Sequence, residues 1–78
     1  MTEQNLHRIR DSLRPLLGRP VQLHAVGERN RILHVGGVLD GVYPRIFTVS
    51  VDDGEHLRRY CYAYSEIVTR RVQVTPAI

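Results

Sequence analysis

The sequence predicts a small, mainly β protein: an SH3-like five-stranded barrel with an N-terminal α-helix. Apolar residues recur at helical spacing near the start, the period changes to two after Pro20, and turn residues divide the remainder into five short segments. With 78 residues, the chain has the length of one domain. We assign that domain to residues 1–78, with the helix and its connector at 1–17 and the barrel at 18–75.

The N-terminal segment is predicted to be an amphipathic helix. Thr2 is a suitable N-cap residue. Pro15 disfavours helical backbone at the residue before it, so the helix should end within residues 12–14. The apolar positions repeat at three- and four-residue spacing: Leu6, Ile9, Leu13 and Leu16.

Five strands follow, separated by turns rich in glycine, proline and aspartate. Gly36 and Gly37 lie inside the second strand and predict a bulge or a bend there. Residues 52–54 (Asp-Asp-Gly) predict a tight hairpin, and residues 65–67 a short helical turn. The expected strands are residues 21–25, 32–39, 46–51, 55–64 and 69–74.

Alternation along each strand predicts which side chains point inward. The expected core consists of Val21, Leu23, Ala25, Leu33, Val35, Phe47, Val49, Val51, Leu57, Cys61, Ala63, Ile67, Val72 and Val74. This choice makes Cys61 a small, unreactive core residue. With Cys61 and Ala63 inside, alternation predicts that Tyr60, Tyr62 and Tyr64 point outward. Either the N-terminal helix or a partner is then expected to cover them.

Composition limits the classes of function. The net charge is +3 and all eleven basic residues are arginine, which permits weak attraction to phosphate polymers without requiring it. The single cysteine allows no intramolecular disulfide, and no apolar run could cross a bilayer, so a cytoplasmic location is expected. The sequence offers no nucleophile–base pair, phosphate loop or metal-ligand cluster, so we expect neither catalysis nor a cofactor.

Several short motifs occur in a characteristic order: Leu17-x-x-x-Val21-x-Leu23-x-Ala25, Gly37-x-Leu39, Tyr43-Pro44-x-x-Phe47, Arg59-x-x-Tyr62-x-Tyr64 and Glu66. With this order and spacing, nearly the whole chain resembles the Veg family of small bacterial proteins, which stimulate biofilm formation. The resemblance implies a non-enzymatic regulator that acts on the transcription of biofilm-related genes through contact with a transcriptional regulator. It implies no catalytic residue.

Tyrosines edged by arginines are typical of protein-binding hot spots and of surfaces that stack bases. For the protein partner, we expect the contact surface to contain Tyr43, Arg45, Arg58, Arg59, Tyr60 and Tyr62. The alternative function is direct nucleic-acid binding, in which the phosphates are neutralised by Arg8, Arg10, Arg14, Arg19 and Arg29.

Two further expectations concern ligands and assembly. A hairpin turning at Arg29 places His24 opposite His34 on the outward face. Two imidazoles there form a weak candidate pair for a transition metal, although two solvent-facing polar residues are the simpler interpretation. A small core and unpaired strand edges also favour self-association, for example as a homodimer.

Overall fold

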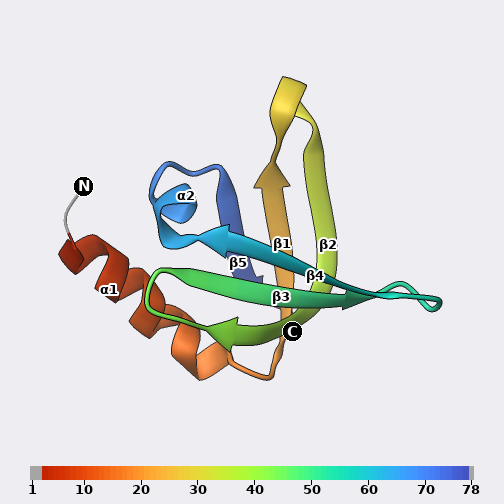
Figure 1. Cartoon of the computed structure of the whole chain (residues 1–78), viewed down its shortest axis with the longest axis horizontal. Coiled ribbons are helices and arrows are strands. Elements are labelled where there is room, and N and C mark those ends of the chain that lie inside the picture. The colour runs from red at the N-terminus through yellow and green to blue at the C-terminus, as the bar shows by residue number, and fades with distance from the viewer. Residues whose placement is uncertain (1–2, 78) are drawn as a thin grey trace.

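The computed structural model describes residues 3–77, and the side chains of all of these except residues 3–5 and 28. It contains an N-terminal helix, five strands and a second, short helix (Figure 1). The elements are α1 (Glu3–Leu13), β1 (Pro20–Val26), β2 (Ile32–Val42), β3 (Ile46–Asp52), β4 (Leu57–Ala63), α2 (Tyr64–Val68) and β5 (Val72–Pro76), with 3₁₀ turns at Arg14–Leu16 and Glu28–Asn30. The expected N-cap, Thr2, lies outside the described residues.

The strands form one antiparallel sheet in the order β4-β3-β2-β1-β5. The prediction of a mainly β fold with an N-terminal helix is therefore confirmed. Closure of the sheet into a barrel is not confirmed, because β4 and β5 are the two edges of the sheet and do not pair with each other. The sheet is strongly curved, and β3 and β4 pass in front of β1 and β2 in Figure 1.

Curvature is concentrated in β2, which changes partner along its length. Its first part pairs with β1 up to Val38, and its last part pairs with β3 from Val38 onward. The register shifts between Leu39 and Gly41, so the irregularity lies after the predicted glycines. Gly37 has a different role, because a Cβ there would press on the Ser50 carbonyl oxygen. The missing side chain lets β3 cross β2 closely.

The core lies between the curved sheet and α1. Leu13 of α1 is buried, and α1 packs against α2 at one end of the sheet (Figure 1). The helix ends at Leu13 as predicted, and a 3₁₀ turn containing Pro15 leads to Gly18, whose φ of 79° turns the chain into β1. The buried apolar residues are Leu13, Val21, Leu23, Ala25, Leu39, Phe47, Val49, Val51, Tyr64 and Val72.

Strand β4 faces the opposite way from the prediction. Tyr60 and Tyr62 pair with Val49 and Phe47 and pack against the core, whereas Cys61 is exposed. Leu57, also expected inside, is 67% exposed. The physical reason is area: tyrosine rings bury far more apolar surface than cysteine or alanine. The predicted outward tyrosine stripe and the buried cysteine are therefore both wrong.

Candidate functional site

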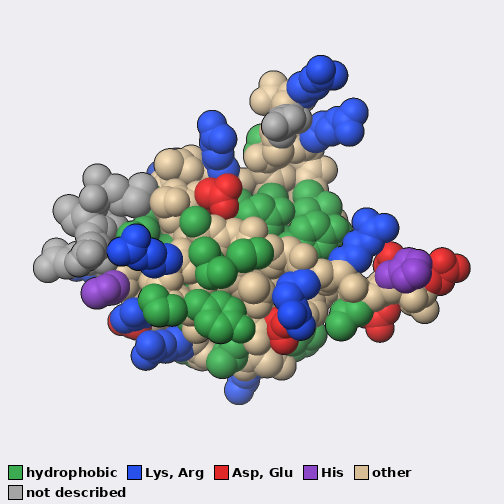
Figure 2. Space-filling view, viewed as in Figure 1, with side chains coloured by type: hydrophobic (Ala, Val, Ile, Leu, Met, Phe, Trp, Pro, Cys, Tyr) green, Lys and Arg blue, Asp and Glu red, His purple; other side chains and the backbone are tan. Residues whose placement is uncertain are grey.

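The outward face of β3 and β4 carries an apolar patch that includes one exposed aromatic ring. The ring of Tyr43, which is 50% exposed, lies on Gly41, where a Cβ would come within 2.5 Å of it. Ile46 and Cys61 are exposed on neighbouring strands. Hydrophobic side chains gather over these strands in Figure 2, with charged groups beside them. We call Tyr43, Ile46, Arg59 and Cys61 the outer patch.

Tyr64 fixes the backbone beneath the outer patch. Its side chain is fully buried, and its hydroxyl donates a hydrogen bond to the carbonyl oxygen of Tyr43, 2.5 Å away. Its backbone N–H donates to the carbonyl oxygen of Arg45 at 3.2 Å. The turn between β2 and β3 is also closed by the Tyr43 N–H, which donates to the Ile46 carbonyl oxygen at 2.9 Å. These hydrogen bonds order the backbone of Tyr43, and its ring packs on Gly41.

Arg59 forms the charged edge of the outer patch. Its Nε lies 2.8 Å from Oδ2 of Asp40, the residue at the register shift in β2. Both side chains are substantially exposed, so this ion pair contributes little to folding stability. Its effect is positional, because it holds the guanidinium over the sheet beside the apolar side chains.

The six residues predicted to bind a protein do not share one surface. Tyr43 and Arg59 lie in the outer patch, and Arg45 is exposed in the turn after Tyr43. Tyr60 and Tyr62 face the core side of β4. Arg58 lies 3.6 Å from Asp53 at the β3–β4 hairpin.

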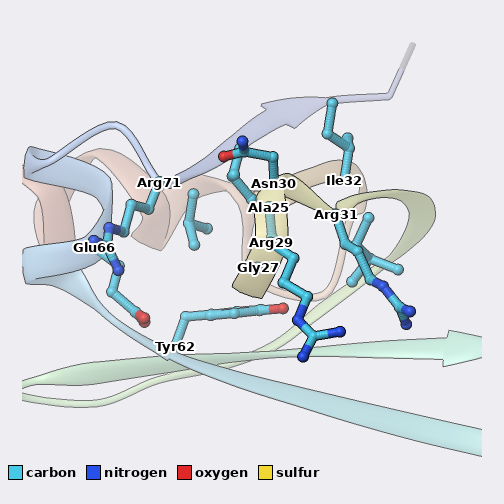
Figure 3. A pocket seen from close by; sticks show the side chains of 12 residues that line it. Ala25, Gly27, Arg29, Asn30, Arg31, Ile32, Tyr62, Glu66 and Arg71 are labelled. Carbon is cyan, nitrogen blue, oxygen red and sulfur yellow. The ribbon is translucent and has the colours of Figure 1, made fainter.

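The open side of the sheet contains a groove with a volume of about 1130 Å³. Its walls come from the tip of the β1–β2 hairpin, from β4 and α2, and from the start of β5 (Figure 3). We call this cavity the groove. Its lining includes Ala25, Gly27, Arg29, Asn30, Arg31, Ile32, Leu33, Tyr62, Glu66, Arg71 and Val72.

Positive charge dominates the groove. Arg29, Arg31 and Arg71 form no ion pair with any described side chain. The Glu66 carboxylate accepts the Ala63 N–H at 3.0 Å and so caps α2. Burial, with smaller contributions from neighbouring Tyr60 and Glu66, raises the pKa of the Tyr62 hydroxyl above its ordinary value. Sequence reasoning missed this site, although the paired arginines were a signal: Arg29 and Arg31 at the predicted first turn, and Arg70 and Arg71 at the start of the predicted fifth strand.

The arginines of the nucleic-acid alternative are distributed over distant parts of the molecule. Arg8, Arg10 and Arg14 belong to α1 and the turn after it, whereas Arg29 lies at the tip of the β1–β2 hairpin. These elements lie at different ends of the molecule in Figure 1. Arg10 and Arg14 also lie 3.6 and 4.0 Å from Asp11. Of this set, Arg29 alone lines the groove.

The predicted histidine pair is present. His24 is the cross-strand partner of His34, and their ring centroids are 5.7 Å apart in an edge-to-face arrangement. Within residues 3–77, no cluster of three or more histidine, cysteine or acidic side chains could hold a metal ion. The pair therefore gains no third ligand from the described part of the chain.

Comparison with known proteins identifies one family. The family profile described as biofilm formation stimulator VEG matches residues 4–75. No curated protein matches the chain. Of the described helices, none has both the length and the apolar character needed to span a membrane.

Proposed function

Because the chain belongs to the Veg family of biofilm formation stimulators, we propose that it is a non-enzymatic regulator of the transcription of biofilm-related genes. It acts by binding a transcriptional regulator through the outer patch. The observation that carries this proposal is the ring of Tyr43, half exposed on a backbone fixed by buried Tyr64.

The composition of the outer patch supports a protein partner. Tyrosine and arginine are enriched among residues that dominate binding energy, especially near the centre of an interface. Tyr43 supplies a ring whose backbone is already ordered, so binding loses little conformational entropy there. Ile46 and Cys61 add apolar area beside the ring, and Arg59 supplies hydrogen-bond donors at the edge.

The test is complementation of a strain that lacks this gene, with a reporter for a biofilm-matrix promoter. We expect the double variant Tyr43→Ala/Arg59→Ala to lose most of the stimulation while its circular dichroism spectrum stays native. Leu57→Ala is the matched control, because Leu57 is 67% exposed but lies outside the outer patch. Full stimulation by a folded double variant would refute the proposed surface.

A second experiment uses the natural cysteine as a probe. Cys61 is exposed within the outer patch, so a bulky maleimide attached to its Sγ should block capture of the regulator. The control is the Cys61→Ser variant treated with the same reagent, which should capture the regulator normally. Equal capture by the labelled and unlabelled proteins would place the binding surface elsewhere.

A further inference from the structure

We propose that the groove binds single-stranded nucleic acid. In this assignment Arg29, Arg31 and Arg71 contact phosphates, and the ring of Tyr62 stacks on a base. The site is separate from the outer patch, because Tyr62 faces the core side of β4 whereas Cys61 faces outward.

The first argument is charge. Three arginines from two separate turns line one cavity together with a single carboxylate, Glu66, and none of the three forms an ion pair with a described side chain. Guanidinium is always charged at physiological pH and matches the geometry of phosphate oxygens. This combination favours a polyanion over a neutral ligand.

The second argument is shape and chemistry. The volume of about 1130 Å³ lies above the range of roughly 300–1,000 Å³ typical of small-molecule pockets, and the cavity is open, so an extended ligand fits it. In Figure 3 the Tyr62 ring is seen nearly edge-on, with its hydroxyl directed toward the Arg29 side of the groove. A ring beside several arginines is the arrangement that stacks bases while the backbone phosphates are neutralised.

The third argument is backbone conformation. Three non-glycine residues have positive φ in the described chain: Arg29 (57°), Asn30 (59°) and Arg70 (64°). All three belong to the two turns that border the groove. Arg70 follows α2 in the turn that ends this helix, where the Arg71 N–H donates to the Glu66 carbonyl oxygen at 2.9 Å. Glycine is the usual residue at the position that Arg70 occupies. Of the three, Arg29 and Asn30 line the groove itself, and backbone strain of this kind clusters at ligand-binding sites.

An acidic peptide would satisfy the same charges, but it would leave the ring of Tyr62 without a stacking partner. The observations therefore favour nucleic acid, and the peptide becomes a competing outcome of the test. Base stacking on an aromatic ring is tolerant of sequence, so we expect little preference among sequences.

The experiment is a fluorescence anisotropy titration of the full chain with a labelled single-stranded oligonucleotide of about 12 nucleotides, within the site sizes of known single-strand binders. RNA, DNA and a duplex of the same sequence are compared at low and near-physiological salt. The test variant is Arg29→Gln/Arg31→Gln/Arg71→Gln. Its matched control, Arg8→Gln/Arg19→Gln/Arg45→Gln, removes the same charge from exposed arginines outside the groove.

We expect the wild-type protein to bind a single strand better than the duplex. The groove variant should lose at least about tenfold in affinity, and the magnitude of its log–log salt slope should fall by about 2, since each lost phosphate contact contributes about 0.7 for single strands. The control variant should change affinity less than about threefold at near-physiological salt, where distant charges are screened.

Tyr62 is tested separately, because its ring also packs near Phe47 with ring centroids 6.1 Å apart. Tyr62→Phe retains the ring and should keep affinity within about twofold, whereas Tyr62→Leu should lose about fivefold or more, at the low end of base–aromatic stacking. Circular dichroism verifies folding of both variants. Three outcomes would overturn the proposal: absence of binding at near-physiological salt, equal losses in groove and control variants, or displacement of the oligonucleotide by a glutamate-rich peptide that binds more tightly.

Discussion

Removal of a single hydroxyl group at Tyr64 tests the link between the core and the outer patch. In Tyr64→Phe the buried ring remains, and the hydrogen bond to the Tyr43 carbonyl oxygen is lost. A hydrogen bond of this kind contributes about 0.5–1.5 kcal/mol net, and an acceptor left in a partly buried place adds to the cost. We expect the free energy of unfolding to fall by about 1–2 kcal/mol, that is a Tm decrease of about 5–15 °C for a domain of this size.

The assay is urea unfolding followed by circular dichroism, with Tyr60→Phe as the matched control. Tyr60 is half-buried on β4, and its hydroxyl donates no hydrogen bond to a described residue. Its loss should cost less than about 0.5 kcal/mol. The reasoning fails if the two variants are equally stable.

The Tyr64→Phe variant should also differ from the wild-type protein in its stability at alkaline pH. Burial raises the pKa of Tyr64 above its ordinary value of 10.0, against the opposing influence of Arg10 and Arg14. A pKa raised on folding means that the folded state retains the proton longer than the unfolded state. The resulting stabilisation is complete below pH 10 and is lost as the pH rises through the folded-state pKa. Wild-type protein should therefore lose stability above pH 10 more steeply than Tyr64→Phe.

Three further changes test the fold and the strained turn. Gly37→Ala should lower the free energy of unfolding by about 3 kcal/mol, because the added Cβ forces β3 away from β2. In Gly36→Ala the added Cβ meets a side-chain amide at an ordinary 3.5 Å, so urea unfolding should show a change of less than about 0.5 kcal/mol. Arg70→Gly should raise stability by about 0.5–1 kcal/mol, since glycine adopts its φ of 64° without strain; a lower Tm would contradict this. Cys61 should react with Ellman's reagent in the native protein nearly as fast as in urea, and a protected thiol would mean that β4 is reversed.

Strand positions and one register could be predicted because they depend on local signals. The short polar turn around Arg29 fixes how the first two strands meet, and His24 does lie opposite His34. The two-residue period and the Asp-Asp-Gly turn likewise placed β3 and β4. In each case, residues close in the chain determine the outcome.

The orientation of β4 could not be predicted in this way. Alternation divides its residues into two sets, but it does not say which set faces inward. The decisive contacts are tertiary: Tyr62 packs near Phe47, and the Tyr64 hydroxyl finds its acceptor in the β2–β3 turn, 21 residues away in the chain. A tyrosine becomes a favourable core residue once its hydroxyl has a partner, and the sequence pattern alone does not reveal that partner.

The groove escaped prediction for a related reason. Its arginines come from the β1–β2 turn and from the connection between α2 and β5, which lie about forty residues apart in the chain. They meet only because β1 pairs with β5 while β4 remains unpaired with β5. In a closed barrel, β4 and β5 would pair with each other and occupy that space. The missing pairing between these two strands therefore leaves the barrel open and also leaves room for the groove.

The reversal of β4 also determines how the two proposed surfaces relate to each other. Because neighbouring side chains on a strand point to opposite faces, Cys61 belongs to the outer patch and Tyr62 to the groove. A protein bound at one surface therefore does not occupy the other, and the two ligands compete only if their remaining parts collide. The segment from Tyr62 to Tyr64 connects the two surfaces, because Tyr62 lines the groove and Tyr64 orders the backbone of Tyr43. Tyr64→Phe should thus weaken the protein contact while leaving oligonucleotide affinity nearly unchanged.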